Sequence, residues 1–339
     1  MNRIGIIGSG NSAKYFLKAI KKHKNFDLIA IGSRNLTKAK SLISTYPKKI
    51  RVTLIDNIIN ATDIDTVFVC IPGHAQPNII CQLFENKKNV ICEKPLSINY
   101  KDSYKVYKAW KKSNRIGLIN FCYNFLPSFI YLKKIIKKND LDIQSIDFNW
   151  KISSRLKNLN KDNWKYFRKM GGGVLYNYGS HALNLLLPEP SKAVILYKNV
   201  LVKIKKKILP LKFWINQSDV ISNFSIREKY LYNFNLSTVN NPNNGIEIKI
   251  CGTKGSIYID NFGSNGPTTG YKIKKYRNNR NKIKMTIIKI KNNNALKLED
   301  LYYRTIDYFD LIYQKKYKKY NMNINEGLWN TQLLEKLSK

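Results

Sequence analysis

The sequence predicts an α/β protein of two domains, in which an N-terminal doubly wound parallel sheet is followed by an α+β domain with an open, mostly antiparallel sheet. Up to about residue 118, short apolar segments alternate with helical ones, which is typical of βαβ units. Beyond Pro127, longer segments alternate apolar and polar residues, as expected for a sheet with one buried face. We place the boundary near residue 120 and expect domains at 1–120 and 121–339.

The elements expected in the first domain are strands separated by helices. The strands are predicted at 4–7, 28–31, 52–55, 66–71, 89–92 and 117–120, and the first two helices at 14–23 and 36–43. In the second domain, a helix at 128–138 precedes strands at 146–152, 193–198, 230–237, 245–252, 256–259 and 282–291. The tetrad at 252–255 predicts a hairpin turn, and helices at 296–313 and 325–337 follow the sheet.

Composition limits the class of protein. With 339 residues and 43% hydrophobic content, the chain is long enough to bury two cores. No apolar run reaches the roughly 18 residues of a membrane span, and the start lacks the pattern of a signal peptide, so we expect a cytoplasmic protein. The five cysteines form no CxxC or CxxH spacing, which predicts reduced core residues and neither a disulfide framework nor a metal site.

The net charge of +38 would by itself suggest a nucleic-acid or membrane partner. Lysine far exceeds arginine, however, and the lysines are spread along the whole chain without a recognised nucleic-acid motif. We interpret the charge as a compositional background at solvent-facing positions. We therefore expect no specific nucleic-acid partner and no membrane partner.

A glycine-rich turn at residues 8–13 joins the first strand to the first helix. Gly8 permits the tight turn, Gly10 lets the backbone approach a phosphate, and Ala13 lets the helix pack closely on the strand. This spacing is the dinucleotide fingerprint, in which the helix N-terminus faces the pyrophosphate. The alternative is a glycine-rich turn that binds nothing. The residues expected to bind the cofactor here are Gly8, Ser9, Gly10, Asn11 and Ser12.

The end of the second strand indicates which dinucleotide is bound. An Asp or Glu at this point would favour NAD by binding the ribose 2′-hydroxyl, but the sequence has Ser33 and Arg34. Arginine offers a planar set of donors that suits a phosphate. We expect NADP as the cofactor, with NAD tolerated, and Ser33 and Arg34 at the 2′-phosphate. The alternative is that Arg34 is only a solvated residue before the next helix.

Lysine and histidine are the candidates for acid–base chemistry. Lys94 follows the fifth strand, at the carboxyl edge of the sheet, where an ammonium group can reach the cofactor and polarise a carbonyl. Pro72 and His74 follow the fourth strand at the same edge, so we expect both near the cofactor, with an exposed loop as the alternative for His74. His23 lies in a Lys-Lys-His-Lys run and is expected to be solvated.

His181 follows three consecutive glycines at 171–173, whose entropic cost suggests that the backbone closely approaches another group. Asn177, His181 and Asn184 are spaced i, i+4 and i+7, which predicts one polar face on a helix. The alternative is a polar stripe whose hydrogen bonds are satisfied within the core.

The turn at 8–13, the Glu93-Lys94-Pro95 tripeptide and the segment from Gly171 to His181 resemble, in this order, the Gfo/Idh/MocA family of glucose-fructose oxidoreductase and inositol dehydrogenase. The resemblance covers nearly the whole chain. It implies a Rossmann domain, a sheet domain often used for dimerisation, and NAD(P)-dependent oxidation or reduction of a sugar or cyclitol hydroxyl. By this resemblance Lys94 is the catalytic lysine, Glu93 supports it in the cofactor site, and His181 contacts the reacting hydroxyl.

The sequence departs from the family pattern at three positions. Asn177 stands where many members have Asp, so it can position a hydroxyl but cannot relay a proton. Asn124 stands where Arg is frequent, and Gln76 stands where His is common. Arg155 lies in a basic segment before the glycines, and it could line the mouth of the substrate site; a solvated basic loop is the alternative.

We therefore expect an oxidoreductase that transfers a hydride between the nicotinamide and a secondary hydroxyl or ketone of a sugar, cyclitol or nucleotide sugar. We also expect a homodimer or homotetramer formed through the C-terminal sheet. The alternative is a catalytically silent NAD(P)- and sugar-binding sensor of the same fold, which Asn177 favours and the presence of Lys94 and His181 opposes. The expected catalytic residues are Lys94, His181 and Asn177, and the expected substrate-binding residues are Lys94, Asn124, Arg155, Asn177 and His181.

Overall fold

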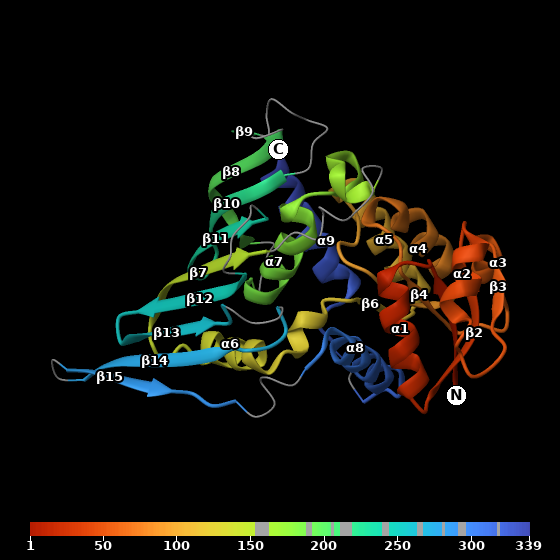
Figure 1. Cartoon of the computed structure of the whole chain (residues 1–339), viewed down its shortest axis with the longest axis horizontal. Coiled ribbons are helices and arrows are strands. Elements are labelled where there is room, and N and C mark those ends of the chain that lie inside the picture. Colours follow the sequence, from red (N-terminus) through yellow and green to blue (C-terminus); the bar gives the residue numbers. More distant parts are fainter. Residues whose placement is uncertain are drawn as a thin grey trace. The chain divides into compact units, whose positions relative to one another are not determined.

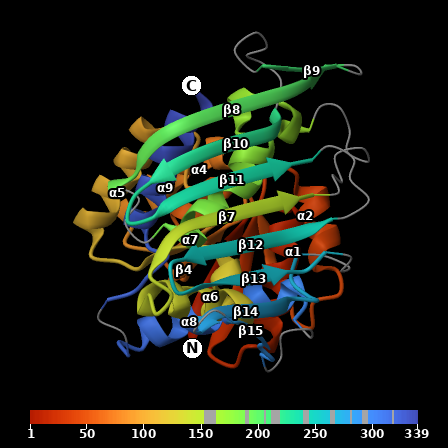
Figure 2. The same ribbon diagram turned by 90° about the vertical axis from the view of Figure 1, so that its left-hand side faces the viewer.

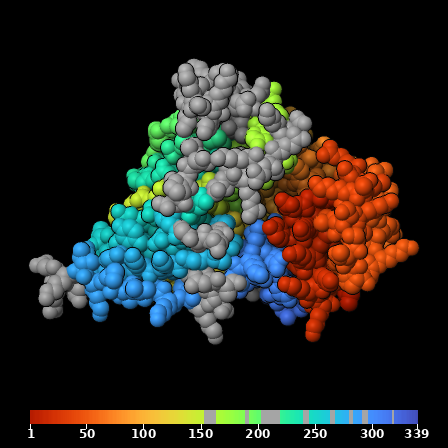
Figure 3. Space-filling view, viewed as in Figure 1, coloured from red at the N-terminus to blue at the C-terminus, as the bar shows by residue number. Residues whose placement is uncertain are grey.

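The computed structural model describes residues 1–152, 163–187, 192–204, 207–210, 219–238, 244–262, 267–279, 282–290, 296–316 and 319–339. Figure 3 colours these residues and leaves the others grey. They fall into two compact units. The first comprises Met1–Cys122 and Leu298–Gln332, and the second comprises Tyr123–Lys297 and Leu333–Lys339. The first unit thus ends close to the expected boundary at residue 120, and it also includes a late segment that the sequence had assigned to the second domain.

The first unit is built on a six-stranded parallel sheet in the order β3-β2-β1-β4-β5-β6, which confirms the predicted doubly wound sheet. Strands β4 and β5 are buried throughout, as apolar runs between two helical layers should be. The strands are β1 (Asn2–Ile7), β2 (Phe26–Gly32), β3 (Arg51–Thr53), β4 (Thr66–Val69), β5 (Asn89–Cys92) and β6 (Gly117–Ile119).

The helices of this sheet connect the strands as predicted, with one correction. Residue 55, expected to end the third strand, begins the short helix α3 instead, because Ile58 and Ile59, three and four residues after Ile55, are buried on the side of the helix that faces the sheet. The helices are α1 (Asn11–Lys22), α2 (Leu36–Ile43), α3 (Ile55–Ile59), α4 (Gln76–Glu85) and α5 (Tyr100–Ser113).

The order of the strands determines where a ligand would bind. Strand β1 lies between β2 and β4, so the direction of winding reverses between β1 and β4. In doubly wound sheets the crevice at this reversal, outside the carboxyl ends of the strands, is the ligand site. The residues that follow β1, β4 and β5 are therefore neighbours along one edge.

Helix α8 (Leu298–Tyr313) packs on α1, and Figure 1 shows the two side by side. The ring centroids of Tyr302 and Phe16 are 4.7 Å apart, and Leu301, Ile306 and Phe309 are buried in the same contact surface. This packing also covers His23, which is only 9% exposed, with its ring 4.6 Å from that of Phe26. The expectation of a solvated His23 is therefore wrong, because α8 covers the end of α1.

The second unit is built on a nine-stranded sheet in the order β15-β14-β13-β12-β7-β11-β10-β8-β9 (Figure 2). Among the strand pairs that the structure describes in this sheet, only that of β7 with β11 is parallel, so the predicted open, mostly antiparallel sheet is confirmed, as is the hairpin turn between β12 and β13. The strands are β7 (Ile143–Lys151), β8 (Val194–Ile204), β9 (Lys207–Pro210), β10 (Asp219–Arg227), β11 (Leu231–Ser237), β12 (Gly245–Gly252), β13 (Gly255–Asp260), β14 (Lys272–Asn279) and β15 (Lys282–Ile287).

The two faces of this sheet differ in chemistry. Alternate residues of β7, among them Phe148 and Trp150, are buried under helices α6 (Pro127–Lys138) and α7 (Ser180–Leu186). On the opposite face, Asn149 donates a hydrogen bond to Glu247 and accepts one from Asn235, at 2.9 and 2.8 Å. That face is polar near the middle of the sheet.

Helix α9 (Ile324–Ser338) runs from the first unit into the second. Ile119 of β6 donates its backbone N–H to the carbonyl of Met322, just before this helix, at 2.7 Å. Among the described residues, no helix combines the length and the apolar character that crossing a bilayer would require.

Candidate active site

The turn between β1 and α1 combines one crowded glycine and one open glycine. Gly8 has a φ of +111°, and a Cβ on it would lie 2.5 Å from the carbonyl oxygen of Cys70, so only glycine fits there. At Gly10 a Cβ would meet no atom within 4 Å. The tight turn is thus imposed by the fold, whereas the space beside Gly10 is available for a ligand.

The residues of this turn fit a pyrophosphate. Gly10 is the N-cap of α1, no side chain caps the helix, and its first turn contains no acidic residue. Because helix N–H groups point toward the N-terminus and carry partial positive charge, this end of α1 favours an anion. Asn11 is exposed, and Ser9 and Ser12 are half-buried, so their side chains lie beside the open position.

The loop after β2 contains the two residues predicted to select the cofactor. Ser33 is only 5% exposed, and its Oγ lies 3.1 Å from the Oγ of Ser9 and accepts the backbone N–H of Asn35. Ser33 therefore connects the glycine turn to this loop. Arg34, next to it, is exposed, so its guanidinium is the cationic group of the loop that a ligand could reach.

The segments that follow β4 and β5 contact each other. Pro72 and His74 are half-buried at a short 3-10 helix over Gly73–Ala75. A Cβ on Gly73 would lie 3.0 Å from the carbonyl oxygen of Pro95, so the two segments pack closely. Lys94, half-buried, lies in the second of these segments, at the same sheet edge as the glycine turn.

Glu93 is held in place by two side chains. It is 8% exposed, and its Oε1 accepts hydrogen bonds from Asn120 Nδ2 and from the Tyr302 hydroxyl, both at 2.9 Å. The Tyr302 hydroxyl also interacts with Ser12, and burial raises the pKa of Tyr302 well above its usual value. Tyr302 of α8 thereby joins the segment of Lys94 to the start of α1. No motif in the sequence marks Tyr302 for this role.

In the second unit, the glycines at 171–173 are explained by crowding within the protein. Gly173 has a φ of +101°, and a Cβ on it would overlap the carboxylate of Asp219. Gly172 likewise packs against the carbonyl of Lys165. The close approach that the sequence suggested is therefore an approach to Asp219 and to the preceding loop.

Asp219, the first residue of β10, fixes the start of the segment that leads to His181. Its Oδ2 accepts the backbone N–H of Leu175 at 2.8 Å, and burial raises the pKa of this carboxyl to about 7. Leu175–Gly179 forms a single π-helical turn, and α7 begins directly after it. No sequence motif marked Asp219.

The π-helical turn alters the polar face expected from regular helical spacing. Asn177 donates from Nδ2 to the carbonyl of Gly173 at 2.7 Å, within its own turn. His181, half-buried, stacks on the ring of Tyr123 with 4.4 Å between the ring centroids. Asn184 accepts a hydrogen bond from Asn124 at 2.8 Å. His181 and Asn184 thus meet the neighbouring residues 123 and 124.

Lys133 of α6 adds a cation to this group of side chains. Its Nζ donates to the side-chain oxygen of Asn124, at the position where arginine is frequent in the family pattern. Lys133 could not be identified from the sequence, because a single lysine on an amphipathic helix does not indicate a binding site. It brings an ammonium group to the side chains expected to bind the substrate.

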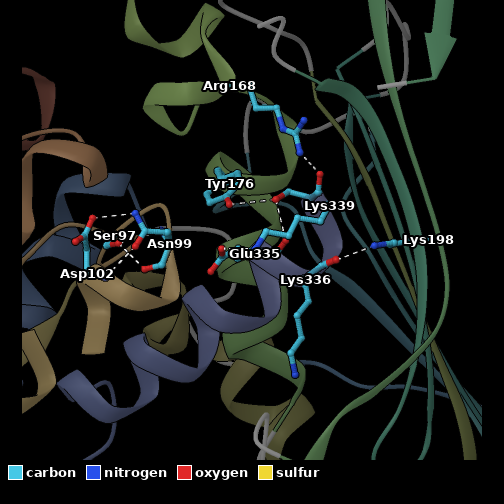
Figure 4. Close-up of polar contacts among 10 residues, drawn as sticks. Ser97, Asn99, Asp102, Arg168, Tyr176, Lys198, Glu335, Lys336 and Lys339 are labelled. Atoms are coloured by element: carbon cyan, nitrogen blue, oxygen red, sulfur yellow. Dashed lines mark hydrogen bonds and ion pairs between the residues drawn. The ribbon is translucent and has the colours of Figure 1, made fainter. Parts of the chain in front are cut away.

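Arg155, predicted at the mouth of the site, lies outside the described residues. The segments on either side of the glycines contact the end of α9. Arg168 donates to the backbone carbonyl of Ser338, and Tyr176 lies 3.3 Å from the hydroxyl of the same serine (Figure 4). The segment before the glycines is thereby attached to the end of α9. Lys94 belongs to the first unit and His181 to the second.

Residues 2–121 match the model of an oxidoreductase family with an NAD-binding Rossmann fold, GFO_IDH_MocA. Over these residues the chain is similar to the Gfo/Idh/MocA family. The glucose-6-phosphate 3-dehydrogenase of Bacillus subtilis is similar, with 27% identity over 189 residues, which are 55% of this chain and 53% of that enzyme. The chain thus spans about half the length of this relative.

Two solved structures share the fold over nearly the whole chain. A levoglucosan dehydrogenase in complex with NADH and L-sorbose has a TM-score of 0.80 at 16% identity, over 99% of this chain and 95% of that one. A 3-ketoreductase from Actinomadura kijaniata, in complex with NADP and TDP-benzene, has a TM-score of 0.76 at 15% identity, over 98% and 96%. These TM-scores show that both units share their fold with the two proteins.

The match identifies residues 2–121 as an NAD-binding Rossmann fold. The matched residues include the glycine turn and the Glu93-Lys94-Pro95 tripeptide, whereas Asn177 and His181 lie beyond them. The open position at Gly10 and the uncapped start of α1 agree with a bound dinucleotide.

Proposed function

We propose that this protein transfers a hydride between NADP and a secondary hydroxyl or ketone of a sugar, cyclitol or nucleotide sugar. One observation carries the proposal. The pyrophosphate turn follows β1, and Lys94 follows β5, so both lie at one edge of the same parallel sheet, beside the reversal of winding. This arrangement brings an ammonium group to the crevice in which the Rossmann fold binds its cofactor.

The side chains of the first unit would act on the side of the reaction that faces the cofactor. When bound, the nicotinamide supplies the hydride donor or acceptor. Lys94 would stabilise negative charge on the reacting oxygen and exchange a proton with it. Glu93, fixed by Asn120 and Tyr302, keeps the segment of Lys94 in place.

The preference for NADP rests on the loop after β2. No carboxylate is present there to bind a ribose 2′-hydroxyl, and Arg34 is exposed beside the buried Ser33. A guanidinium forms paired, charge-assisted hydrogen bonds with a phosphate. Arg34 is therefore our candidate for the 2′-phosphate, and Ser33 supports the loop.

The second unit would bind the sugar. His181 would hold or move the proton of the reacting hydroxyl, while Asn177 and Asn124 would position neighbouring hydroxyls. Because Lys133 contacts Asn124, we expect a substrate with a phosphate, a carboxylate or a nucleotide group. Arg155 remains our proposal for the mouth of the site. The glucose-6-phosphate and TDP named for the similar proteins are ligands of this anionic kind.

We further propose a cytoplasmic homodimer or homotetramer that assembles through the sheet of the second unit, without a nucleic-acid or membrane partner. The support is an apolar stripe on the outermost strand. Ile283, Met285 and Ile287 of β15 are 72%, 51% and 62% exposed, and they lie on the same face as the polar residues of β7.

A spectroscopic screen tests the proposed function. The purified protein is mixed with NADP or NADPH and a panel of sugars, sugar phosphates and nucleotide sugars, and nicotinamide absorbance is followed. We expect turnover with at least one anionic sugar, and turnover about a hundredfold slower or more with Lys94→Met. Tight binding of NADP without turnover on any member of the panel would instead favour a silent sensor.

A further inference from the structure

Gln76, the first residue of α4, is fully buried and donates from one atom to two carbonyl groups. Its Nε2 lies 2.9 Å from the carbonyl oxygen of Glu93 and 2.9 Å from that of Pro95. These residues are the two neighbours of Lys94 in the chain. One nitrogen of the Gln76 side chain therefore binds the backbone carbonyl before Lys94 and the one after it.

Few side chains can make this contact. A primary amide carries two N–H groups on one nitrogen, whereas a hydroxyl or a ring nitrogen offers at most one. A carboxylate would place negative oxygens against two carbonyl oxygens. The two carbonyls therefore favour a neutral primary amide at position 76, and they set the orientation of that amide.

The amide makes these two bonds at a cost. The Oε1 of Gln76 is buried and has no hydrogen-bond partner within the part of the chain that the structure describes. An unsatisfied buried acceptor costs about 1–3 kcal/mol. Such a cost is tolerated where the donors on the same group are needed, because without them two further carbonyls would be buried unpaired.

The other residues of this segment have separate anchors. The backbone N–H of Glu93 donates to Val69 of β4 at 3.0 Å. Beyond Pro95, Leu96 is fully buried, and the hydroxyl of Ser97 accepts the backbone N–H of Asn99 at 3.0 Å (Figure 4). Gln76 bridges the residue between these anchors, Lys94.

We propose that Gln76 is a positioning residue for Lys94, which sets the direction in which the lysine side chain leaves the backbone. The inference rests on the proposed role of Lys94 in catalysis. It predicts that loss of the two donors displaces the amine while the glycine turn and the first sheet remain intact. Turnover should then fall about tenfold or more, since catalysis is sensitive to small displacements, while NADP affinity is retained.

The reactivity of the Lys94 amine tests this without a known substrate. The folded protein is acetylated by a trace of acetic anhydride across a range of pH, and each lysine is quantified by peptide mass spectrometry. Two variants are compared with the unmutated protein: Gln76→Met, which has no donor, and Gln76→His, which retains one. Gln82→Met, at an exposed position of the same helix, is the matched control. Lys88, whose Nζ donates to the carbonyl of Ile64 at 2.8 Å, is the internal reference.

We expect the acetylation rate of Lys94 relative to Lys88 to change about threefold or more in Gln76→Met, less in Gln76→His, and not in Gln82→Met. If Gln76→Met does not fold, the proposal is tested by the pH profile of Lys94 acetylation in Gln76→His. Unchanged Lys94 profiles in the folded variants would overturn the proposal, whatever Lys94 does in catalysis. A changed profile together with full turnover by Lys94→Met would contradict only the proposed function.

Discussion

Ser33 and Arg34 are neighbours in the sequence, but the structure gives them different surroundings. Ser33 is buried against Ser9, whereas Arg34 is exposed at the start of the β2–α2 loop. The sequence had assigned both to the 2′-phosphate. The geometry favours different roles for the two residues: Ser33 holds the loop, and Arg34 contacts the ligand.

This division predicts the cofactor preference. If Arg34 makes charge-assisted bonds worth about 1.5–3 kcal/mol, NADP should bind roughly tenfold to a hundredfold more tightly than NAD. Arg34→Ala should remove most of that difference, and Lys40→Ala, an exposed cation on α2, should leave it unchanged. Isothermal titration of each variant with both cofactors measures the effect. Equal dissociation constants in the unmutated protein would contradict the assignment.

Asp219 predicts how stability depends on pH. Burial raises the pKa of its carboxyl to about 7 in the folded protein, while an unfolded chain has a value of about 3.9. Between these values the folded state retains a proton that the unfolded state has released, so the free energy of unfolding falls as pH rises from about 4 to about 7.

Asp219→Asn should remove this contribution, because the amide does not titrate. Urea denaturation across that pH window should show a shallower decline in the variant than in the unmutated protein. Asp147→Asn, on the polar face of the second sheet, serves as the control. Identical slopes for the Asp219 variant and the unmutated protein would show that this carboxyl does not titrate there.

At the scale of elements, the β1–α1 turn contains two glycines whose surroundings differ. Gly8 is required by the chain, since a side chain would approach Cys70. Gly10 is not required by any described neighbour. The same motif therefore contains one glycine that the fold requires and one beside open space, which we propose is occupied by the ligand.

Alanine variants at the two positions distinguish a glycine needed for folding from one needed for cofactor binding. Gly10→Ala should change the stability of the cofactor-free protein by about 1 kcal/mol or less, because the weaker N-cap is offset by the lower entropy of the unfolded chain. It should nevertheless weaken NADP binding about tenfold or more, because its Cβ would occupy the space of the pyrophosphate. Gly8→Ala should lower the melting temperature clearly, because of its φ of +111°. Thermal scans and cofactor titration measure both. Normal NADP affinity in Gly10→Ala would contradict the proposed pyrophosphate site.

The sequence predicted most elements because their signals are local. The strand at 89–92 and the helix at 36–43 were found with their observed bounds, since apolar runs and helical periodicity need no distant partner. The π-helical turn at Leu175–Gly179 was missed, because it depends on Asp219 of a later strand. Tyr302 was missed for the same reason: its partner Glu93 lies more than 200 residues earlier.

At the scale of the whole molecule, positive charge collects even in the Rossmann unit, away from the glycine turn. A hollow of about 610 Å³ between α4 and α5 is lined by four lysines and by Glu85. In a chain with a net charge of +38, such a cluster is consistent with compositional background. The lysines are Lys87, Lys105, Lys108 and Lys112.

If the charge is background, any binding of DNA should be independent of sequence and strongly weakened by salt. Raising the salt from about 50 to about 200 mM should reduce affinity by several orders of magnitude, as for contacts to phosphates alone. Fluorescence anisotropy with two unrelated duplexes measures this. Sequence-selective binding that persists at physiological salt would contradict our interpretation of the composition.

The central claim is that Lys94 of the first unit and His181 of the second serve one reaction. With a substrate from the screen, Lys94→Met should lower turnover about a hundredfold or more, because it removes the charge that stabilises the developing oxyanion. His181→Asn should cost roughly as much, because it removes a proton carrier and keeps a hydrogen-bonding group. Both variants should bind NADP with unchanged affinity, which shows that they are folded. If both turn the substrate over at the unmutated rate, the proposed site is wrong.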